Sequence, residues 1–80
     1  MNTTQAINTI LNNTQSHIGK VCRVTMVNGE TRYVDHWDAC AGVAVRLYMV
    51  DNCGRDCGHI KVDHNNLTDY ITHVGNEEVI

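Results

Sequence analysis

The stretch of this chain with the clearest potential for chemistry is DNCGRDCGH, residues 51–59. Two thiols, Cys53 and Cys57, lie four residues apart, and the imidazole of His59 follows closely. Thiolate and imidazole groups are common zinc ligands in proteins. A fourth ligand would have to come from elsewhere in the chain, and the candidates are His64, Cys40 and His36.

The spacing of the two thiols argues against a zinc site. Zinc knuckles use Cys-x-x-Cys pairs, whereas Cys53 and Cys57 have three residues between them, and the sequence holds no second pair of matching spacing. A hairpin tip accounts for the stretch without a metal, because Gly54 can take the first central position of a type II′ turn. We therefore predict no metal and no cofactor, with two free thiols at a loop tip.

The length of this turn determines which face of the neighbouring strands is buried. A two-residue turn pairs Met49 with Ile60 and points the two thiols to opposite faces of the hairpin. A three-residue turn would place them opposite each other, within reach of a disulfide. It would also bury Ala44, Arg46, Tyr48 and Val50, which make a poorer core. We expect the two-residue turn.

A second arrangement with chemical potential is Cys40, with His36 and Asp38 just upstream. A thiol nucleophile needs a base within reach and surroundings that lower its pKa. No oxyanion-binding motif accompanies these residues, and Cys22 falls on an apolar strand face where thiols are usually inert. We predict no catalytic residue, and the chain is not expected to be an enzyme.

The elements that must position these residues begin with a helix over about residues 4–12. Asn2, Thr3 or Thr4 can cap it, and Asn12 and Asn13 can end it. The helix is too short to be stable alone in water, so its apolar stripe of Ile7, Ile10 and Leu11 with Ala6 must pack on something. Packing on a sheet is the simpler interpretation, and binding a partner is the alternative.

A change of period after Gly19 predicts strands. KVCRVTMV and TRYVDHWD flank Asn28-Gly29, a strong hairpin signal that pairs Val27 with Glu30. This register gives an inward face of Cys22, Val24, Met26, Tyr33, Asp35 and Trp37.

Further strands are expected at 43–51, at 58–63 and in TDYITHV, with residues 75–80 as a frayed tail. The inward residues of the first two are Val43, Val45, Leu47, Met49, Ile60 and Val62. The chain is then a single domain over residues 1–80, with its barrel at about 19–74. The fold class is mainly β (α+β), a short N-terminal helix followed by a four- to five-stranded antiparallel sheet.

Three stretches, VTMVNGETRYV, VAVRLYMVD and IKVDHNNLTDYI, resemble the small barrels of the SH3 and Sm-like type. The resemblance implies that Leu67 plugs one end of the barrel before the last strand. Cys22 at the start of the first strand, the VNGET turn and the IKVD strand resemble Rof-type antitermination proteins, which bind the Rho helicase and block its RNA site. The RNA-contacting Asp-x-x-x-Asn loop of Sm-like proteins is not matched after Asp38.

The charges of the chain are unevenly distributed. Residues 1–50 carry four Lys and Arg against three Asp and Glu, whereas residues 51–80 carry two against six. Nucleic-acid binding normally requires a basic surface, so we predict no direct nucleic-acid partner. The candidate partner-binding residues are the carboxylates and tyrosines of the acidic part and its border: Asp51, Asp56, Asp63, Asp69, Tyr48 and Tyr70.

These patterns favour a small acidic binding protein. We expect its partner to be another protein with a basic nucleic-acid-binding surface, such as a Rho-type helicase or a bacterial defence (CRISPR) complex, which it would inhibit. Self-association is compatible with the sequence. The alternatives are an RNA-binding Sm-like oligomer and a small zinc module. Without a long apolar run or a secretory signal, we expect a cytoplasmic protein with no membrane partner.

Overall fold

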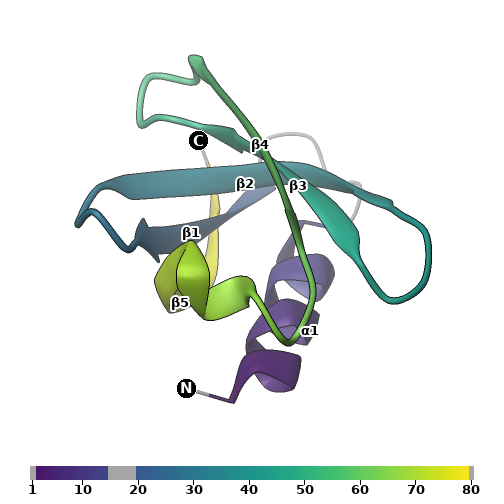
Figure 1. Ribbon diagram of the computed structural model, residues 1–80. Helices are drawn as coiled ribbons and strands as arrows, with labels where there is room; N and C mark the ends of the chain where they lie inside the picture. Colours follow the sequence, from purple (N-terminus) through teal and green to yellow (C-terminus); the bar gives the residue numbers. More distant parts are fainter. Residues whose placement is uncertain (1, 15–19, 80) are drawn as a thin grey trace.

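A computed structural model describes residues 2–14 and 20–79 of the chain. One helix is followed by five antiparallel strands in a single bent sheet with strand order β4-β3-β2-β1-β5 (Figure 1). This confirms the predicted fold class and is compatible with a small barrel. No helix among the described residues is long and apolar enough to cross a membrane. The elements are α1 (Thr3–Asn13), β1 (Lys20–Met26), β2 (Thr31–Ala39), β3 (Val45–Val50), β4 (Asp56–Val62), the 3-10 helix η1 (Leu67–Asp69) and β5 (Ile71–Val79).

The helix is capped and buried as the sequence predicts. The side chain of Asn2 accepts a hydrogen bond from the backbone amide of Gln5 at 3.0 Å, which satisfies one of the donors left open at a helix start. At the other end, the amide of Thr14 donates to the carbonyl of Ile10. Ala6 and Ile10 are buried in the core, so the apolar stripe of α1 packs against the sheet.

The core combines α1, all five strands and η1. Leu67 is fully buried, which agrees with the plug that the barrel resemblance implies. The turn before it is held by Asp63, whose carboxylate accepts the backbone amides of Asn65 and Asn66. The buried apolar residues are Ala6, Ile10, Val21, Cys22, Val24, Val34, Val45, Leu47, Met49, Val62, Leu67 and Ile71.

The predicted two-residue turn between β1 and β2 is wrong, because the loop has three residues. The amide of Met26 donates to the carbonyl of Glu30, and the amide of Gly29 donates to the carbonyl of Met26. Gly29 has φ 88°, a left-handed conformation that favours glycine. Val27 therefore belongs to the loop with Asn28 and is not paired with Glu30.

This longer loop shifts the register and changes the inward face of β2. Cys22 lies opposite Val34, and Val34 is fully buried. The prediction that Tyr33 and Asp35 point into the core is therefore wrong. A bulge between Val34 and His36 then restores the alternation, so that Trp37 packs against the core as expected.

The turn between β3 and β4 repeats the same geometry, so the predicted two-residue turn is also wrong there. The amide of Asp51 donates to the carbonyl of Arg55, and the amide of Gly54 donates to the carbonyl of Asp51. The loop therefore contains three residues, Asn52, Cys53 and Gly54, and because Cys53 lies within it, it is not the three-residue turn that would place Cys53 opposite Cys57. Both loops place a glycine with positive φ at their third position.

A bulge in β4 keeps the predicted core of β3 despite the longer turn. Tyr48 lies opposite His59 and Val50 lies opposite Asp56, so β4 contains one extra residue between these pairs. Gly58 in this interval has φ 83°. Val45, Leu47 and Met49 are buried as predicted, whereas Val43, predicted inward, is 72% exposed in the turn before β3.

The predicted frayed tail at 75–80 is wrong, since β5 continues to Val79. Lys20, Val21 and Cys22 at the start of β1 lie opposite Val79, Glu78 and Glu77. This pairing gives backbone partners to the first residues of β1, and β5 becomes the edge of the sheet. Residue 19, where the barrel was predicted to begin, and residue 80 lie outside the described residues.

Candidate protein-binding surface

Two residues with exposed side chains, Val27 and Tyr70, are joined through their backbones at one end of the sheet. The backbone amide of Val27, in the β1–β2 turn, donates to the carbonyl of Tyr70 at 2.9 Å, directly after η1. Val27 is 54% exposed and Tyr70 is 39% exposed. Among the described residues, Val43 is the other large hydrophobic side chain that is exposed. A paired, exposed tyrosine and valine have the chemistry of an interface anchor.

Four carboxylates lie in segments at the same end of the sheet as this pair. The β1–β2 turn, the β3–β4 turn and η1 all lie on the left side of the sheet in Figure 1. We call this end of the sheet the hairpin end and use the name for six residues. These are Val27, Glu30, Asp51, Asp56, Asp69 and Tyr70.

Asp51 is held in place by the β3–β4 turn. One of its carboxylate oxygens accepts the backbone amides of Cys53 at 2.8 Å and Arg55 at 2.9 Å. The hydrogen bond from the Arg55 amide is the largest cause that lowers the pKa of Asp51 below its ordinary value of 3.8. The charges of Arg55 and of Arg32 across the sheet also lower this pKa. Asp51 is therefore a fixed anion.

Asp56 and Asp69 complete the acidic part of the hairpin end. Asp56 lies opposite Val50 at the start of β4, and its carboxylate accepts the amide of Gly58 at 2.9 Å. Asp69 is exposed at the end of η1, directly before Tyr70. Both carboxylates are thus placed by short, hydrogen-bonded segments of backbone.

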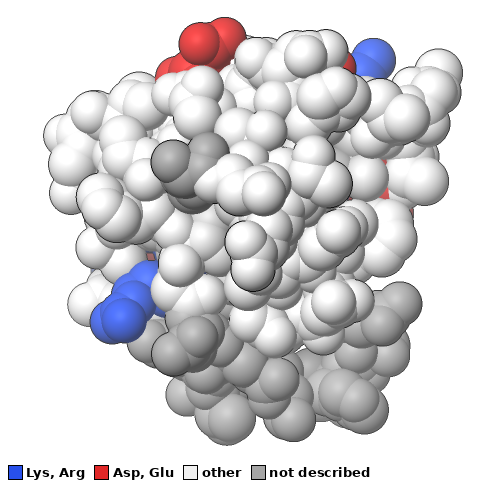
Figure 2. Space-filling view, turned by 90° about the horizontal axis from the view of Figure 1, so that it is seen from below, with Lys and Arg blue, Asp and Glu red and all other residues white. Residues whose placement is uncertain are grey.

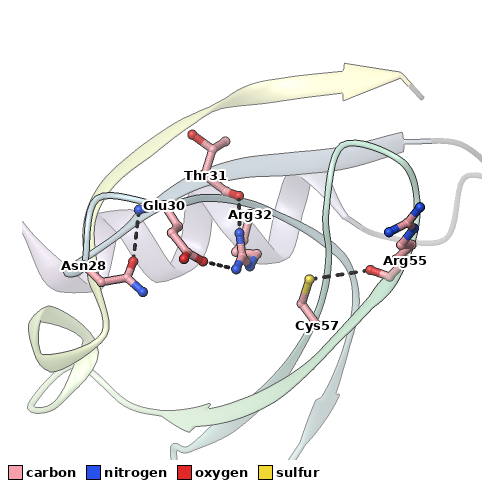
Figure 3. A network of polar contacts seen from close by, with 6 residues as sticks. All are labelled: Asn28, Glu30, Thr31, Arg32, Arg55 and Cys57. Atoms are coloured by element: carbon pink, nitrogen blue, oxygen red, sulfur yellow. Dashed lines mark hydrogen bonds and ion pairs between the residues drawn. The ribbon is translucent and has the colours of Figure 1, made fainter.

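Glu30 is the member of the hairpin end that forms an ion pair. It lies directly before β2 and contacts the guanidinium of Arg32 on that strand, and Arg32 also donates to the carbonyl of Thr31 (Figure 3). The side chain of Asn28 accepts the amide of Glu30 at 2.9 Å, which fixes the turn. The hairpin end therefore carries four carboxylates, of which Arg32 partly neutralises Glu30 and the charges of Arg55 and Arg32 act on Asp51.

Two predicted binding residues lie elsewhere in the structure. Asp63 follows the last residue of β4, whereas Asp56 is the first, so the strand separates the two carboxylates by its full length. Tyr48 lies in the middle of β3, on the face opposite the buried Leu47 and Met49. The predicted acidic patch is therefore not one continuous surface.

Tyr48 is part of a ladder of rings across three strands. The rings of His36 and Tyr48 stack at a centroid distance of 4.2 Å with 5° between their planes, and His59 lies at 5.4 Å with a tilt of 45°. Because β2 and β4 flank β3, the two histidines lie on opposite sides of Tyr48. Its hydroxyl donates to Asp38 at 2.8 Å and accepts from Arg46 at 3.3 Å, which raises the pKa of Arg46.

The candidate zinc ligands show no metal-binding geometry. Among the described residues, no group of three or more His, Cys, Asp or Glu side chains could hold a metal ion. Cys53 is exposed and Cys57 half-buried, and neither is in a disulfide. Their sulfurs lie near the side-chain oxygen of Asn52 and the carbonyl of Arg55, each at 3.6 Å (the second is drawn in Figure 3).

The candidate catalytic residues each make contacts with other residues rather than with one another. The Nδ1 atom of His36 contacts the carboxylate of Asp35 at 2.7 Å, while Asp38 accepts from Tyr48. The half-buried Cys40 begins the turn after β2, where its amide donates to Ala44. The described contacts therefore do not join a thiol, a base and an orienting carboxylate.

Sequence reasoning missed Val27 as part of the candidate surface. The alternation of β1 placed this residue in a strand, whereas its amide bonds to Tyr70 in a distant part of the chain. An apolar residue directly before Asn28-Gly29 was the available signal, because it fits a three-residue turn equally well.

Comparison with models of protein families, with curated proteins and with solved structures finds no match to the chain.

Proposed function

We propose that this chain is a non-enzymatic binding protein that docks on a basic surface of another protein through the hairpin end. The observation that supports this proposal best is the exposure of the Val27 and Tyr70 side chains, on two residues whose backbones are hydrogen-bonded to each other. Tyrosine is enriched among the residues that carry most of the binding energy at protein interfaces, and such residues are typically surrounded by a polar rim.

The carboxylates of the hairpin end favour a basic partner. Asp51 and Asp56 are fixed by backbone amides in the unbound chain, so binding does not have to order them. Their negative charge, with that of Asp69, would steer a positively charged surface toward Tyr70 and speed association. Each exposed charge contributes little alone, so the group acts together.

Proteins that bind nucleic acids typically present a basic groove to the phosphate backbone. By occupying such a groove, the chain would exclude the nucleic acid and so inhibit the partner protein. A Rho-type helicase is one such partner, which the likeness to Rof-type proteins suggests, and a bacterial defence (CRISPR) complex is another. Tyr48 does not offer a free ring face for stacking a base, because His36 and His59 flank it. This disfavours base stacking on Tyr48, and the carboxylates of the hairpin end would repel RNA phosphates.

Capture from a cell lysate with matched variants tests the proposal. Tagged wild-type protein, the double variant Val27→Ser/Tyr70→Ala and the control Val43→Ser are compared, since Val43 is an exposed valine outside the hairpin end. We expect a nucleic-acid-binding protein to be captured by the wild type and by Val43→Ser but lost from the double variant. Equal capture by all three, or capture of RNA without protein, would refute it.

A further inference from the structure

A groove lies between α1 and the free edge of β5. It has a volume of about 450 Å³ and is lined by Asn2, Gln5, Ala6 and Thr9 on the helix and by Thr72, His73 and Val74 on the strand. β5 pairs with β1 on one side and is the last strand of the sheet. The groove therefore has a helix as one wall and a strand edge as the other.

The hydrogen-bonding pattern of β1 shows which backbone groups of β5 face this groove. Met26 donates its amide to Glu30 of β2, so even-numbered residues of β1 bond to β2 and odd-numbered residues bond to β5. Val27, whose amide bonds to Tyr70, agrees with this alternation. Thr25 lies opposite His73, and these two residues form a hydrogen-bonded pair between β1 and β5. Val74 is the next residue of β5, so its amide and carbonyl point away from β1.

The lining of the groove indicates the chemistry of its occupant. None of the seven residues is Lys, Arg, Asp or Glu, and α1 as a whole carries no such side chain. Seen from below in the orientation of Figure 1, the described surface is mostly uncharged, with charged side chains toward its margins (Figure 2). Ala6 and Val74 supply apolar surface, and Gln5 supplies a polar side chain that can bond in either direction.

We infer that this groove binds an extended, uncharged peptide segment of another protein, which adds a short strand to the edge of β5. An extended main chain is the ligand that matches an outward amide and carbonyl on a strand edge. Register shifts on both sides of His73 and Val74 interrupt the edge, so the added strand covers about three residues, ~10 Å of chain. This inference does not depend on the hairpin end.

Selection of short random peptides displayed on phage, followed by NMR with the enriched peptides, tests the inference. We expect bound peptides to slow hydrogen exchange at the Val74 amide and to leave exchange at the His73 amide, already bonded to β1, nearly unchanged. Gln5→Trp fills the groove from an exposed helix position and should weaken binding about tenfold. Asn12→Trp, also exposed on α1 but outside the groove, should leave the affinity nearly unchanged.

Three outcomes would overturn the inference. The first is that no peptide is enriched. The second is that enriched peptides perturb other residues and bind Gln5→Trp as well as the wild type. The third is that the Val74 amide becomes protected with rising protein concentration and no peptide, because the occupant would then be a second copy of the chain.

Discussion

The amide of Val27 donates to the carbonyl of Tyr70, and this bond joins the β1–β2 turn to the segment that closes the sheet. Both partners are backbone atoms, so side-chain substitutions at these positions leave the bond in place. Both side chains are exposed and contribute little to the core. The double variant Val27→Ser/Tyr70→Ala should therefore keep its free energy of unfolding within about 1 kcal/mol of wild type in urea denaturation. A larger loss would show that these side chains support the fold rather than binding.

Leu67 should be among the positions where truncation costs most. Its side chain is fully buried in the core between β4 and β5. Leu67→Ala removes buried methyl groups and leaves a cavity, so we expect a loss of about 2–5 kcal/mol in the free energy of unfolding. Thr68→Ala, next to it and exposed, serves as the control and should change stability little. Similar effects for the two variants would contradict a plugging role.

The sequence was sufficient for the fold because the strands alternate clearly and the helix is capped locally. It was not sufficient for register. Asn28-Gly29 correctly marked a turn, but Val27 joins the loop through a bond to Tyr70, which no local pattern reveals. The bulge at Gly58 likewise compensates for a longer turn, and sequence alternation alone does not encode such compensation.

The candidate surface could be predicted in part. Asp51, Asp56, Asp69 and Tyr70 were chosen by charge and residue type, and the structure groups them at one end of the sheet. Asp63 and Tyr48 met the same criteria. These two residues lie elsewhere, because Asp63 follows the far end of β4 and Tyr48 lies within β3. Such positions depend on strand direction and on strand pairing, which charge and residue type do not reveal.

Asp51 should titrate below its ordinary pKa of 3.8, because backbone amides and arginine charges stabilise its anion. A pKa lowered in the folded state stabilises the fold above the unfolded pKa, and this contribution is lost as pH falls through the folded pKa. Asp51→Asn keeps an acceptor oxygen without the charge. This variant should therefore have a lower free energy of unfolding than wild type, and the difference should shrink as the pH falls below 3.8. An NMR titration that places the Asp51 carboxyl at or above its ordinary value would contradict this.

The chain should bind no metal in stoichiometric amounts. The Cys-x-x-x-Cys spacing is wrong for a knuckle, and the sheet packs around an apolar core. Elemental analysis of protein purified without chelator checks this directly. Cys53→Ser and Cys57→Ser should have little effect on stability. One zinc per chain that is lost in these variants together with stability would show that the thiols hold a metal.

The most direct test of the proposed function is the association rate of the captured partner, measured against salt concentration. Paired charge reversal, Asp56→Lys/Asp69→Lys, is compared with wild type. Asp51 and Asp63 are poorer choices for reversal because each carboxylate accepts two backbone amides of a turn, whereas that of Asp56 accepts one. Asp63→Lys lies outside the hairpin end and serves as a control, which should slow association less than the double reversal. Reversal of Glu77 or Glu78 should also change the association rate less.

If the hairpin end docks on a basic surface, association of the wild type slows as salt rises, because screening acts over about 8–10 Å. The double variant associates more slowly at low salt and depends less on salt, while its dissociation rate changes little. Association that is indifferent to both salt and charge reversal would contradict the account. So would tight RNA binding by the isolated protein, which would support an Sm-like function instead.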